Sequence, residues 1–395
     1  MSLILTRSPY FVSREDLDES ATLQLDIGLY DTDLGGINVM KTYNLVFRSS
    51  FYIDISPFLR DYLGTDYEYN AFSGNYISTV SGDILYVRTT LSGTKNGVVQ
   101  SDVVSSSFAT DGYLYSEESF NKDFAGELRD NSFYAGSTDL VYKLDDANLS
   151  LRLLAVDVDH FSSPSTDYVD VIYKKNSEVL ASKRVSFDYD YTRFSLRNVF
   201  SSGASSYEAR VLDANGVLEE TKCLSDFLED FRLEDYDEVV LASKDGNVKN
   251  IKVKTIEECK YPTYRATFKN RYGVDEDLWF FKRSDKSITV NKEQYRSSSI
   301  ASYSAGDGVK TMINFNVNGQ EKIVLNSGFV EEEMYEAFKQ LLLSEEVTLY
   351  DYNNNKTYQV NLGTSELQYK QHVNDKLINY TIEFEFAHEV INNVG

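Results

Sequence analysis

Residues 257–283 read Glu-Glu-Cys-Lys-Tyr-Pro-Thr-Tyr-Arg-Ala-Thr-Phe-Lys-Asn-Arg-Tyr-Gly-Val-Asp-Glu-Asp-Leu-Trp-Phe-Phe-Lys-Arg. Within them Tyr264, Ala266 and Phe268 alternate with polar side chains, and this period of two predicts a half-buried strand. Turn-forming residues surround Gly273, and the apolar run Leu-Trp-Phe-Phe follows at 278–281. The stretch predicts a β-hairpin with a heavy aromatic load, and it offers no catalytic group.

The composition indicates a folded protein that is rich in strands. A chain of 395 residues is long enough for two or three domains. A hydrophobic content of 42% excludes wholesale disorder, even at a net charge of -23. Thirty Tyr and 23 Phe against one Trp and four Met favour β structure. The acidic balance argues against binding to a phosphate backbone, which needs clustered Lys and Arg.

The cysteines and the apolar segments of the sequence indicate the cellular compartment in which the protein folds. The two cysteines, Cys223 and Cys259, make neither a disulfide framework nor a metal knuckle, and we expect both to be reduced. The N-terminus lacks the apolar core of a signal peptide, and no stretch approaches the ~20 apolar residues of a membrane span. We therefore expect a protein that folds in a cytoplasm and stays there or joins an assembly.

The first predicted domain, residues 1–148, is β-rich. Its predicted strands cover residues 3–6, 23–29, 43–47, 51–55 and 84–91. Ser56 as N-cap and Pro57 at the first helical position predict a short helix over 56–63. Residues 65–82 are polar, rich in Tyr and punctuated by Gly, which predicts a long surface loop.

The middle domain, residues 149–222, is predicted to be sandwich-like. Alternating Leu149, Leu151 and Leu153 are followed by a meander over 169–185. Asn215-Gly216 between two apolar pairs predicts a two-residue hairpin turn. Short strands at this spacing are typical of a sandwich or barrel. An acidic, partly helical connector is predicted over 224–236, beside the domain boundary.

The C-terminal domain, residues 223–395, is predicted to be a β-sandwich with one helix. Asn318-Gly319 predicts a second hairpin turn between strands at 310–317 and 321–325. Apolar spacing and three Glu in the first turn predict a helix over 330–344. The last strand, 377–387, is predicted to be central to its sheet. One face of that strand holds Ile378, Tyr380, Ile382, Phe384 and Phe386.

Three histidines give little basis for metal or nucleophile chemistry. His160 follows Asp157 and Asp159, a set that suits a metal or acid-base site but equally a solvated turn after a strand, which we favour. His372 and His388 lie far apart in sequence, with no Cys nearby. Zinc needs three or four ligands at compatible spacing, and no such set is present. The Gly-x-Ser-x-Gly elbow of a serine hydrolase is also absent.

Acidic pairs carry little information in a chain with 62 Asp and Glu. Asp188 and Asp190 alternate with Tyr and would suit a glycosidase cleft, although a solvent-facing strand is the simpler interpretation. Residues 31–36, Asp-Thr-Asp-Leu-Gly-Gly, resemble part of a calcium loop but lack its later ligands, so we interpret them as a turn. There is no glycine-rich phosphate loop. We therefore predict that the protein is not an enzyme and has no catalytic, cofactor-binding or metal-binding residue.

Surface tyrosine is the one positive sign of function. The loop that begins near residue 62 contains Tyr62, Tyr67, Tyr69 and Tyr76 among Gly, Ser and Asn. Tyr with small polar residues suits a contact surface for protein or carbohydrate. An ordinary loop packed on its own sheet would have the same composition, and both interpretations stay open.

Several segments resemble a family of tail structural proteins from phages of Bacteroidetes, crAss-like phages included. Besides residues 257–261, 272–274 and 278–283, they are Ile-Ser-Pro-Phe-Leu-Arg-Asp-Tyr-Leu (55–63), Asp-Gly-Tyr-Leu-Tyr (111–115), Asn-Ser-Gly-Phe-Val (326–330), Leu-Leu-Leu-Ser (341–344) and Asn-Asp-Lys-Leu-Ile-Asn-Tyr-Thr (374–381). The likeness is best over about residues 220–395, patchy before that, and weakest over 150–210. These are packing and turn residues, so the resemblance transfers no catalytic site.

The resemblance implies a mainly β chain of several sandwich domains, the last of them similar to a tail tube. It implies a tail hub, tube-end or ring protein that forms a homo-oligomeric ring, six- or twelve-fold, around a DNA channel. The implied partners are other virion tail proteins and DNA that passes without specific binding. The implied location is the virion tail, assembled in the host cytoplasm. An acidic lumen would let DNA slide without sticking.

Two other functions stay open from the sequence. The Tyr-rich loops also suit a receptor- or carbohydrate-binding protein at the tail tip, which would have an exposed aromatic platform. A cell-wall glycan hydrolase would need a cleft with a perturbed carboxylate pair, for which Asp188 and Asp190 are the candidates.

Overall fold

The computed structural model is mainly β, with 59% strand and 9% helix, as the composition predicts. It describes residues 2–17, 20–31, 36–49, 51–63, 84–122, 124–144, 149–154, 168–186, 193–197, 208–212, 218–223, 236–257, 260–298, 312–366 and 377–391. No helix among these residues has the length and apolar character to cross a membrane.

The chain forms two compact units, which are interleaved in sequence. Unit 1 contains Met1–Glu257 and Phe268–Asp277, and unit 2 contains Glu258–Thr267 and Leu278–Gly395. Unit 1 therefore includes the tip of the hairpin that the sequence predicts around Gly273. The three domains expected at 1–148, 149–222 and 223–395 remain predictions.

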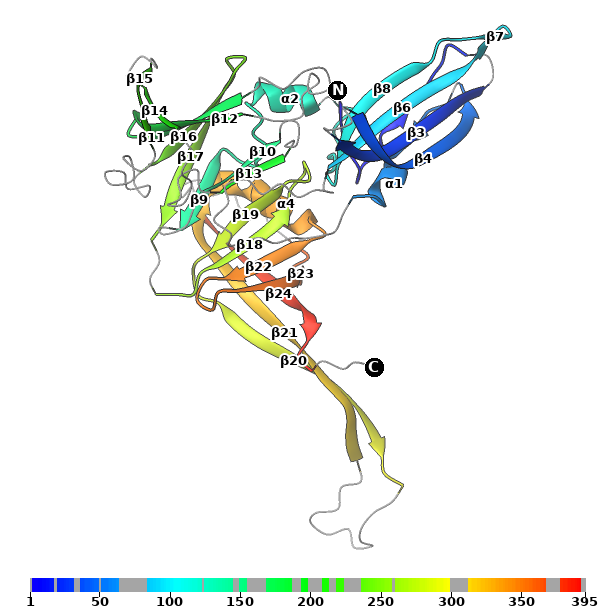
Figure 1. Ribbon diagram of the computed structural model, residues 1–395. Coiled ribbons are helices and arrows are strands. Elements are labelled where there is room, and N and C mark those ends of the chain that lie inside the picture. The colour runs from blue at the N-terminus through cyan, green and yellow to red at the C-terminus, as the bar shows by residue number, and fades with distance from the viewer. Residues whose placement is uncertain are drawn as a thin grey trace, which may run out of the picture. The chain divides into compact units, whose positions relative to one another are not determined.

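Unit 1 begins with an open sheet that contains four of the five strands predicted for the first domain (Figure 1). The strand predicted at 51–55 is reduced to Ile53–Asp54 and lies outside this sheet. The order of the sheet is β1 (Ser2–Leu5), β8 (Val103–Thr110), β6 (Ile84–Lys95), β3 (Ser20–Asp31) and β4 (Gly36–Arg48), with the short β7 (Val98–Val99) paired to β6. The β1–β8 pair is parallel and the other pairs are antiparallel. The two-residue strands β2 (Phe11–Val12) and β5 (Ile53–Asp54) pair separately.

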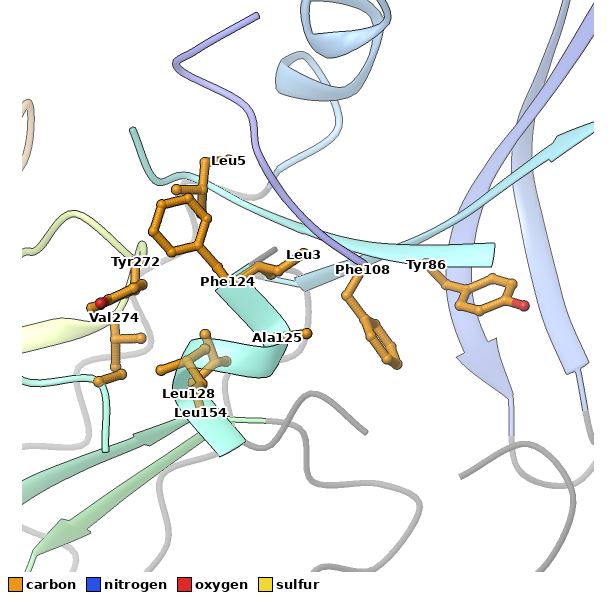
Figure 2. Packing of buried hydrophobic residues seen from close by; sticks show 11 residues of the cluster. Leu3, Leu5, Tyr86, Phe108, Phe124, Ala125, Leu128, Leu154, Tyr272 and Val274 are labelled. Carbon is orange, nitrogen blue, oxygen red and sulfur yellow. The ribbon is translucent and has the colours of Figure 1, made fainter. Parts of the chain in front are cut away.

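Alternation along β1, β6 and β8 places apolar side chains on both faces of this sheet. Leu3 and Leu5 enter one buried cluster together with Phe108, whereas Ile4 between them enters another. The first cluster also takes in α2 (Phe124–Asp130) and the tip of the hairpin through Tyr272 (Figure 2). The sheet therefore separates two hydrophobic cores.

The helix predicted over 56–63 is shorter, since α1 covers Ser56–Arg60. Its N-cap residue is Ile55 rather than Ser56. Asp54 supplies the capping group instead, because its Oδ1 accepts hydrogen bonds from the N–H (3.0 Å) and Oγ (2.7 Å) of Ser56. The last turn tightens when the Tyr62 N–H donates to the Leu59 carbonyl three residues back, and this ends the helix early.

We expect Asp54→Ala to lower the free energy of unfolding of unit 1 by about 1–2 kcal/mol. The same carboxylate oxygen also accepts the Tyr10 N–H at 3.0 Å, so its loss affects both the helix start and the neighbouring ribbon. Urea unfolding followed by circular dichroism measures the change. Asp61→Ala, at the exposed C-terminal end of the same helix, is the matched control. An equal loss in both variants would contradict the capping role.

Unit 1 also contains a second, seven-stranded sheet. Its order is β15 (Leu218–Cys223), β14 (Glu208–Leu212), β12 (Glu178–Ser186), β11 (Tyr168–Lys175), β16 (Glu238–Ser243), β17 (Val248–Ile256) and β9 (Leu140–Leu144). A separate ribbon joins β10 (Ser150–Leu154) to β13 (Arg193–Arg197). The antiparallel β14–β15 pair confirms the strands predicted on either side of Asn215-Gly216, whereas those two residues lie outside the described part.

The sheet of unit 2 is built around the C-terminal strand. Its order is β19 (Asp275–Phe280), β18 (Tyr264–Lys269), β22 (Val347–Asp351), β23 (Lys356–Leu362), β24 (Leu377–Glu389), β21 (Met312–Glu331) and β20 (Asp285–Arg296). The central position predicted for β24 is confirmed, since it lies between β23 and β21. Its predicted apolar face is buried from Ile378 to Phe386.

The predicted half-burial of β18 is wrong, because all six of its residues are buried. Successive side chains of a strand point to opposite faces of its sheet, so burial of all six means that both faces of β18 are covered. Arg265 is accommodated by aromatic rings, with its guanidinium 5.4 Å from the Tyr350 ring centroid and 5.9 Å from that of Tyr352.

The predicted turn at Asn318-Gly319 is also wrong, because β21 runs through both residues. In the β20–β21 pair, Asn318 lies opposite Asn291 and Gly319 opposite Val290. The Asn318 side chain is used in tertiary contacts, since its Oδ1 accepts the N–H of Ile391 at 3.0 Å and its Nδ2 donates to the Ile391 carbonyl at 2.9 Å. These contacts with the end of the chain outweigh the local preference for a turn.

The helix predicted over 330–344 begins later than expected. Val330 and Glu331 still pair with β24, and a 3-10 turn, η3 (Glu332–Met334), leads into α4 (Tyr335–Leu343). Phe338 of α4 stacks on Tyr380 of β24, with ring centroids 4.4 Å apart. Edge-to-face contacts join Phe280 to Phe338 and to Phe384, so α4 closes an aromatic core against the sheet.

Several other predicted segments lie wholly or partly outside the described residues. They are the turn at 31–36, the loop at 65–82, residues 157–160 and the acidic connector at 224–236.

Candidate interaction surfaces

Most residues that the sequence suggests for chemistry lie outside the described part of the chain. These are Asp157, Asp159, His160, Asp188, Asp190 and His372. His388 is described and is exposed on β24, where its ring lies 5.9 Å from that of Phe386. Within the described ranges, no group of three or more His, Cys, Asp or Glu side chains could hold a metal ion.

The Tyr-rich loop is described only at its start. The Tyr62 hydroxyl lies 3.0 Å from that of Tyr43 on β4, and the two rings meet edge to face. Tyr62 therefore packs on its own sheet, whereas Tyr67, Tyr69 and Tyr76 are outside the described residues.

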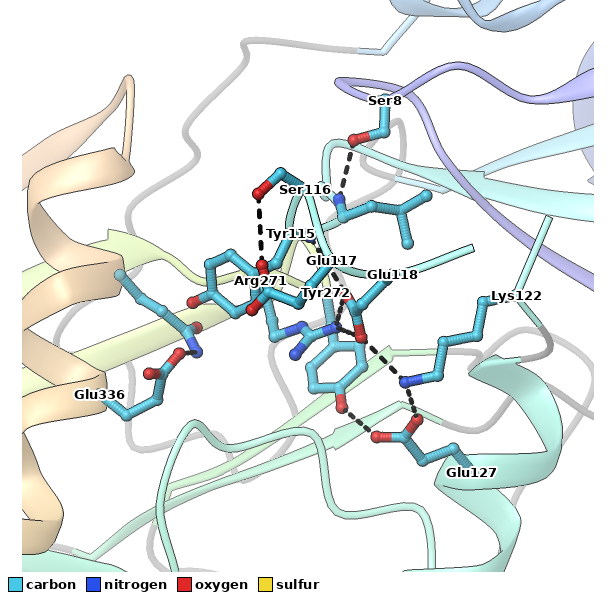
Figure 3. A network of polar contacts seen from close by, with 12 residues as sticks. Ser8, Tyr115, Ser116, Glu117, Glu118, Lys122, Glu127, Arg271, Tyr272 and Glu336 are labelled. Atoms are coloured by element: carbon cyan, nitrogen blue, oxygen red, sulfur yellow. Dashed lines mark hydrogen bonds and ion pairs between the residues drawn. The ribbon is translucent and has the colours of Figure 1, made fainter. Parts of the chain in front are cut away.

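A network of charges joins the hairpin tip to the rest of unit 1 (Figure 3). The Arg271 guanidinium donates to both oxygens of Glu118, at 2.8 and 2.7 Å. Lys122 bridges Glu118 (2.9 Å) and Glu127 (2.7 Å), and the Tyr272 hydroxyl donates to Glu127 at 3.1 Å. Charge-assisted pairs of this kind orient the tip as well as stabilise it.

The same contacts control the protonation of Glu118. Burial alone would raise the pKa of this carboxyl, but hydrogen bonds from Arg271, the Tyr115 N–H and Lys122 outweigh it and lower the pKa to about 2. Burial raises the pKa of the Tyr272 phenol, which stays neutral and able to donate. Glu118 is therefore ionised at neutral pH and matched to Arg271.

A buried asparagine holds the turn of the hairpin. Asn270 is fully buried, and its Oδ1 accepts the N–H groups of Tyr272 (3.0 Å) and Val274 (3.2 Å). Its Nδ2 donates to the Ala135 carbonyl (2.6 Å) and to Glu276 (2.9 Å). All four hydrogen bonds of the amide are thus satisfied.

This network is best understood as structural. Each ionised group faces an opposite charge, and the groups connect separate segments of unit 1. Sequence reasoning missed it because Glu118 and Arg271 are 153 residues apart. No local pattern indicates such a pair.

The surface most open to a partner lies on β20 and β21, the two strands of unit 2 that extend beyond the rest of their sheet (Figure 1). β21 pairs with β24 only from Gln320 onward, so residues 290–296 and 312–319 form strand pairs with each other alone. At the base of this ribbon Asn318 and Gly319 are buried, and the Gly319 carbonyl accepts the Val390 N–H at 2.8 Å. We call this two-stranded ribbon the arm; it continues past the sheet (Figure 1). At about 3.4 Å per residue, its seven residues of β20 span roughly 24 Å. Every residue of β20 is exposed.

The arm carries apolar side chains without a core of its own. Tyr295 and Phe315 meet edge to face with ring centroids 5.5 Å apart, yet they are 48% and 44% exposed. Val290, Met312 and Val317 are also exposed. A polar pair, Gln294 to Asn314 at 2.7 Å, accompanies them.

Unit 1 has a second exposed apolar group at the end of its open sheet. Val98 and Val99 of β7 are 63% and 77% exposed, and Val103 and Val104 at the start of β8 are exposed as well. The connecting turn has Asn96 and Gly97 at positive φ, 51° and 75°, which fixes a tight reversal.

Comparison with known proteins identifies no relative. No protein-family model matches the chain, and neither the curated proteins nor the solved structures give a significant match.

Proposed function

We propose that this protein is a non-enzymatic structural subunit of a virion tail, a hub, tube-end or ring protein that forms a homo-oligomeric ring around the DNA channel. In this proposal the domains are β-sandwiches, and the C-terminal one, with α4, is similar to a tail tube. The subunits assemble in the host cytoplasm and contact other tail proteins.

The observation that carries the proposal is the arm. An isolated two-stranded ribbon is marginally stable in water, and soluble monomers seldom expose a contiguous set of apolar side chains without a role for it. A subunit of an assembly resolves both problems, because a neighbour covers the ribbon. The net charge of -23 agrees with a channel that lets DNA pass without binding it.

Mass photometry together with negative-stain imaging of the full chain tests the proposal. We expect closed rings, six- or twelve-fold, at concentrations where neighbours bind. A monodisperse trimer with no rings at any concentration would contradict the ring and favour a receptor-binding protein.

A receptor- or carbohydrate-binding role has one observation in its favour. Phe51, Tyr52 and Phe120 are exposed aromatic residues that flank the β2–β5 ribbon, with Phe120 packed edge to face on Phe11 at 5.2 Å. Exposed rings of this kind suit stacking on a sugar. Glycan binding that is lost in Phe120→Ala, with assembly unchanged, would support this second function.

A further inference from the structure

The strand β4 ends the open sheet of unit 1, and within the described part of the chain one of its edges has no partner. β4 pairs with β3 on one side and with no other described strand on the other. The backbone N–H and C=O groups along such an edge can form the hydrogen-bond ladder of one further strand. The chemistry of the edge therefore selects an extended segment as its partner.

The edge of β4 lacks the protection that the other sheet edges have. In the three large sheets described, β1, β9, β15 and β19 end a sheet with only four to six residues each. β20 is longer, but it has Lys292 and a register shift beside it, and lysine and bulges both discourage strand addition. β4 has 13 residues, and its segment 42–47 contains no charge, no proline and no register shift. A long edge of this kind recruits another strand.

The hydrophobic core behind β4 is open along the same edge. Tyr43, Leu45 and Phe47 point to one face of the sheet. They pack against the buried cluster that contains Leu23 and Leu25 of β3, yet all three remain only partly buried. A strand added at this edge would cover the row and extend the core.

The segment is complementary to itself when two copies run antiparallel. A two-fold axis perpendicular to the sheet at Leu45 places Tyr43 of each copy opposite Phe47 of the other, and Leu45 opposite Leu45. On the other face of the sheet, Asn44 lies opposite Val46, and no two like charges meet. Aromatic and apolar cross-strand pairs stabilise a sheet, whereas facing like charges destabilise it.

We propose that β4 pairs antiparallel with β4 of a second copy of this chain, with the two-fold axis at Leu45, so that the open sheets of the two copies become one continuous sheet. The contact is isologous, because the same surface of both copies takes part. It goes beyond the proposed function, since a two-fold contact gives a dimer with or without a ring.

Sedimentation velocity of the full chain over a range of concentrations tests the contact. Asn44→Lys with Val46→Lys sets like charges opposite each other twice and should weaken association by about tenfold or more. Both side chains are exposed, so the fold should tolerate the change. Val98→Lys with Val99→Lys, at exposed positions of β7, is the matched control and should associate as the wild type does. A wild-type chain that does not associate at any concentration, or a Lys variant at 44 and 46 that associates unchanged, would overturn the proposal.

Mixing two variants separates a lost contact from a misfolded chain. A chain with Asn44→Glu and Val46→Glu should also fail to associate with itself. It should associate with the Lys variant at 44 and 46, because opposite charges then face each other across the two-fold axis. If circular dichroism shows that both variants are folded and the mixture still fails to associate, the contact is overturned.

Cysteine cross-linking tests the register. Directly opposite residues of an antiparallel pair have Cβ atoms about 4.5–5.5 Å apart, close to the separation in a disulfide, whereas diagonal neighbours lie farther apart. Oxidation of a mixture of Asn44→Cys chains and Val46→Cys chains should therefore give mainly the disulfide between the two kinds of chain, identified by peptide mapping. A main product between two Asn44→Cys chains, or between two Val46→Cys chains, would overturn the axis at Leu45.

Discussion

Asn270→Ala is expected to lower the free energy of unfolding of unit 1 by about 3–5 kcal/mol. The change removes four hydrogen bonds at a fully buried position. It leaves the N–H groups of Tyr272 and Val274 without the side-chain oxygen that satisfies them. The turn must then open, or stay closed with two buried N–H groups that lack an acceptor. Either result loosens the packing of Tyr272 in its hydrophobic cluster.

Urea unfolding gives the free energy, and hydrogen exchange across residues 268–277 reports on the turn itself. Asn44→Ala, at an exposed position of β4, is the matched control and should change stability by no more than about 0.5 kcal/mol. If both variants unfold alike, the hairpin tip does not depend on the Asn270 amide.

Acidification is expected to remove about 3 kcal/mol of stability from unit 1 as the pH falls from 4.5 toward 2. The pKa of Glu118 is lowered in the folded state, from 4.5 to about 2, so the unfolded chain binds this proton first. Stabilisation by the ionised carboxylate is complete above the unfolded pKa and is lost as the pH falls through the folded one. The side chain is only 14% exposed, so solvent screens the pair with Arg271 weakly.

Glu118→Gln gives the specific test. At neutral pH it leaves the Arg271 guanidinium without its charged partner and should cost on the order of 3 kcal/mol. It should also flatten the dependence of stability on pH between 4.5 and 2, because the titrating group is gone. Glu117→Gln, one residue earlier and exposed, should keep the wild-type profile. A Glu118→Gln chain with an unchanged acid transition would contradict the assignment of that transition to Glu118.

The fold follows from the sequence where local pattern and burial agree. Alternation of Ile378, Tyr380 and Ile382 indicates a strand with one buried face, and the structure confirms both that face and the position of the strand between β23 and β21. Alternation around Tyr264 marked β18, but the period of two could not reveal that Arg265 is covered by aromatic rings. Burial of a polar face depends on neighbours that are distant in sequence.

The candidate surfaces were less accessible to sequence reasoning. Asn318-Gly319 has the composition of a tight hairpin turn, but pairing with β20 and the contacts of Asn318 with Ile391 keep both residues in β21. That misplaced turn concealed the arm, because it divided the long strand into two short ones. The pairing of Glu118 with Arg271 has no local signature at all, since a separation of 153 residues leaves no periodic pattern.

The interleaving of the two units has a consequence for synthesis on the ribosome. Leu3 and Val274 belong to one buried cluster, so this one of the two cores of unit 1 cannot close until the hairpin tip has emerged. At about 5–20 residues per second, that delay is roughly 15–50 s after Leu3 is made. During this time the nascent chain exposes the apolar faces of Phe108 and Phe124, which makes it a substrate for chaperones. The contact between the first and the last parts of unit 1 therefore delays its folding. The N-terminal 257 residues can finish folding only after the first segment of unit 2, residues 258–267, has been translated.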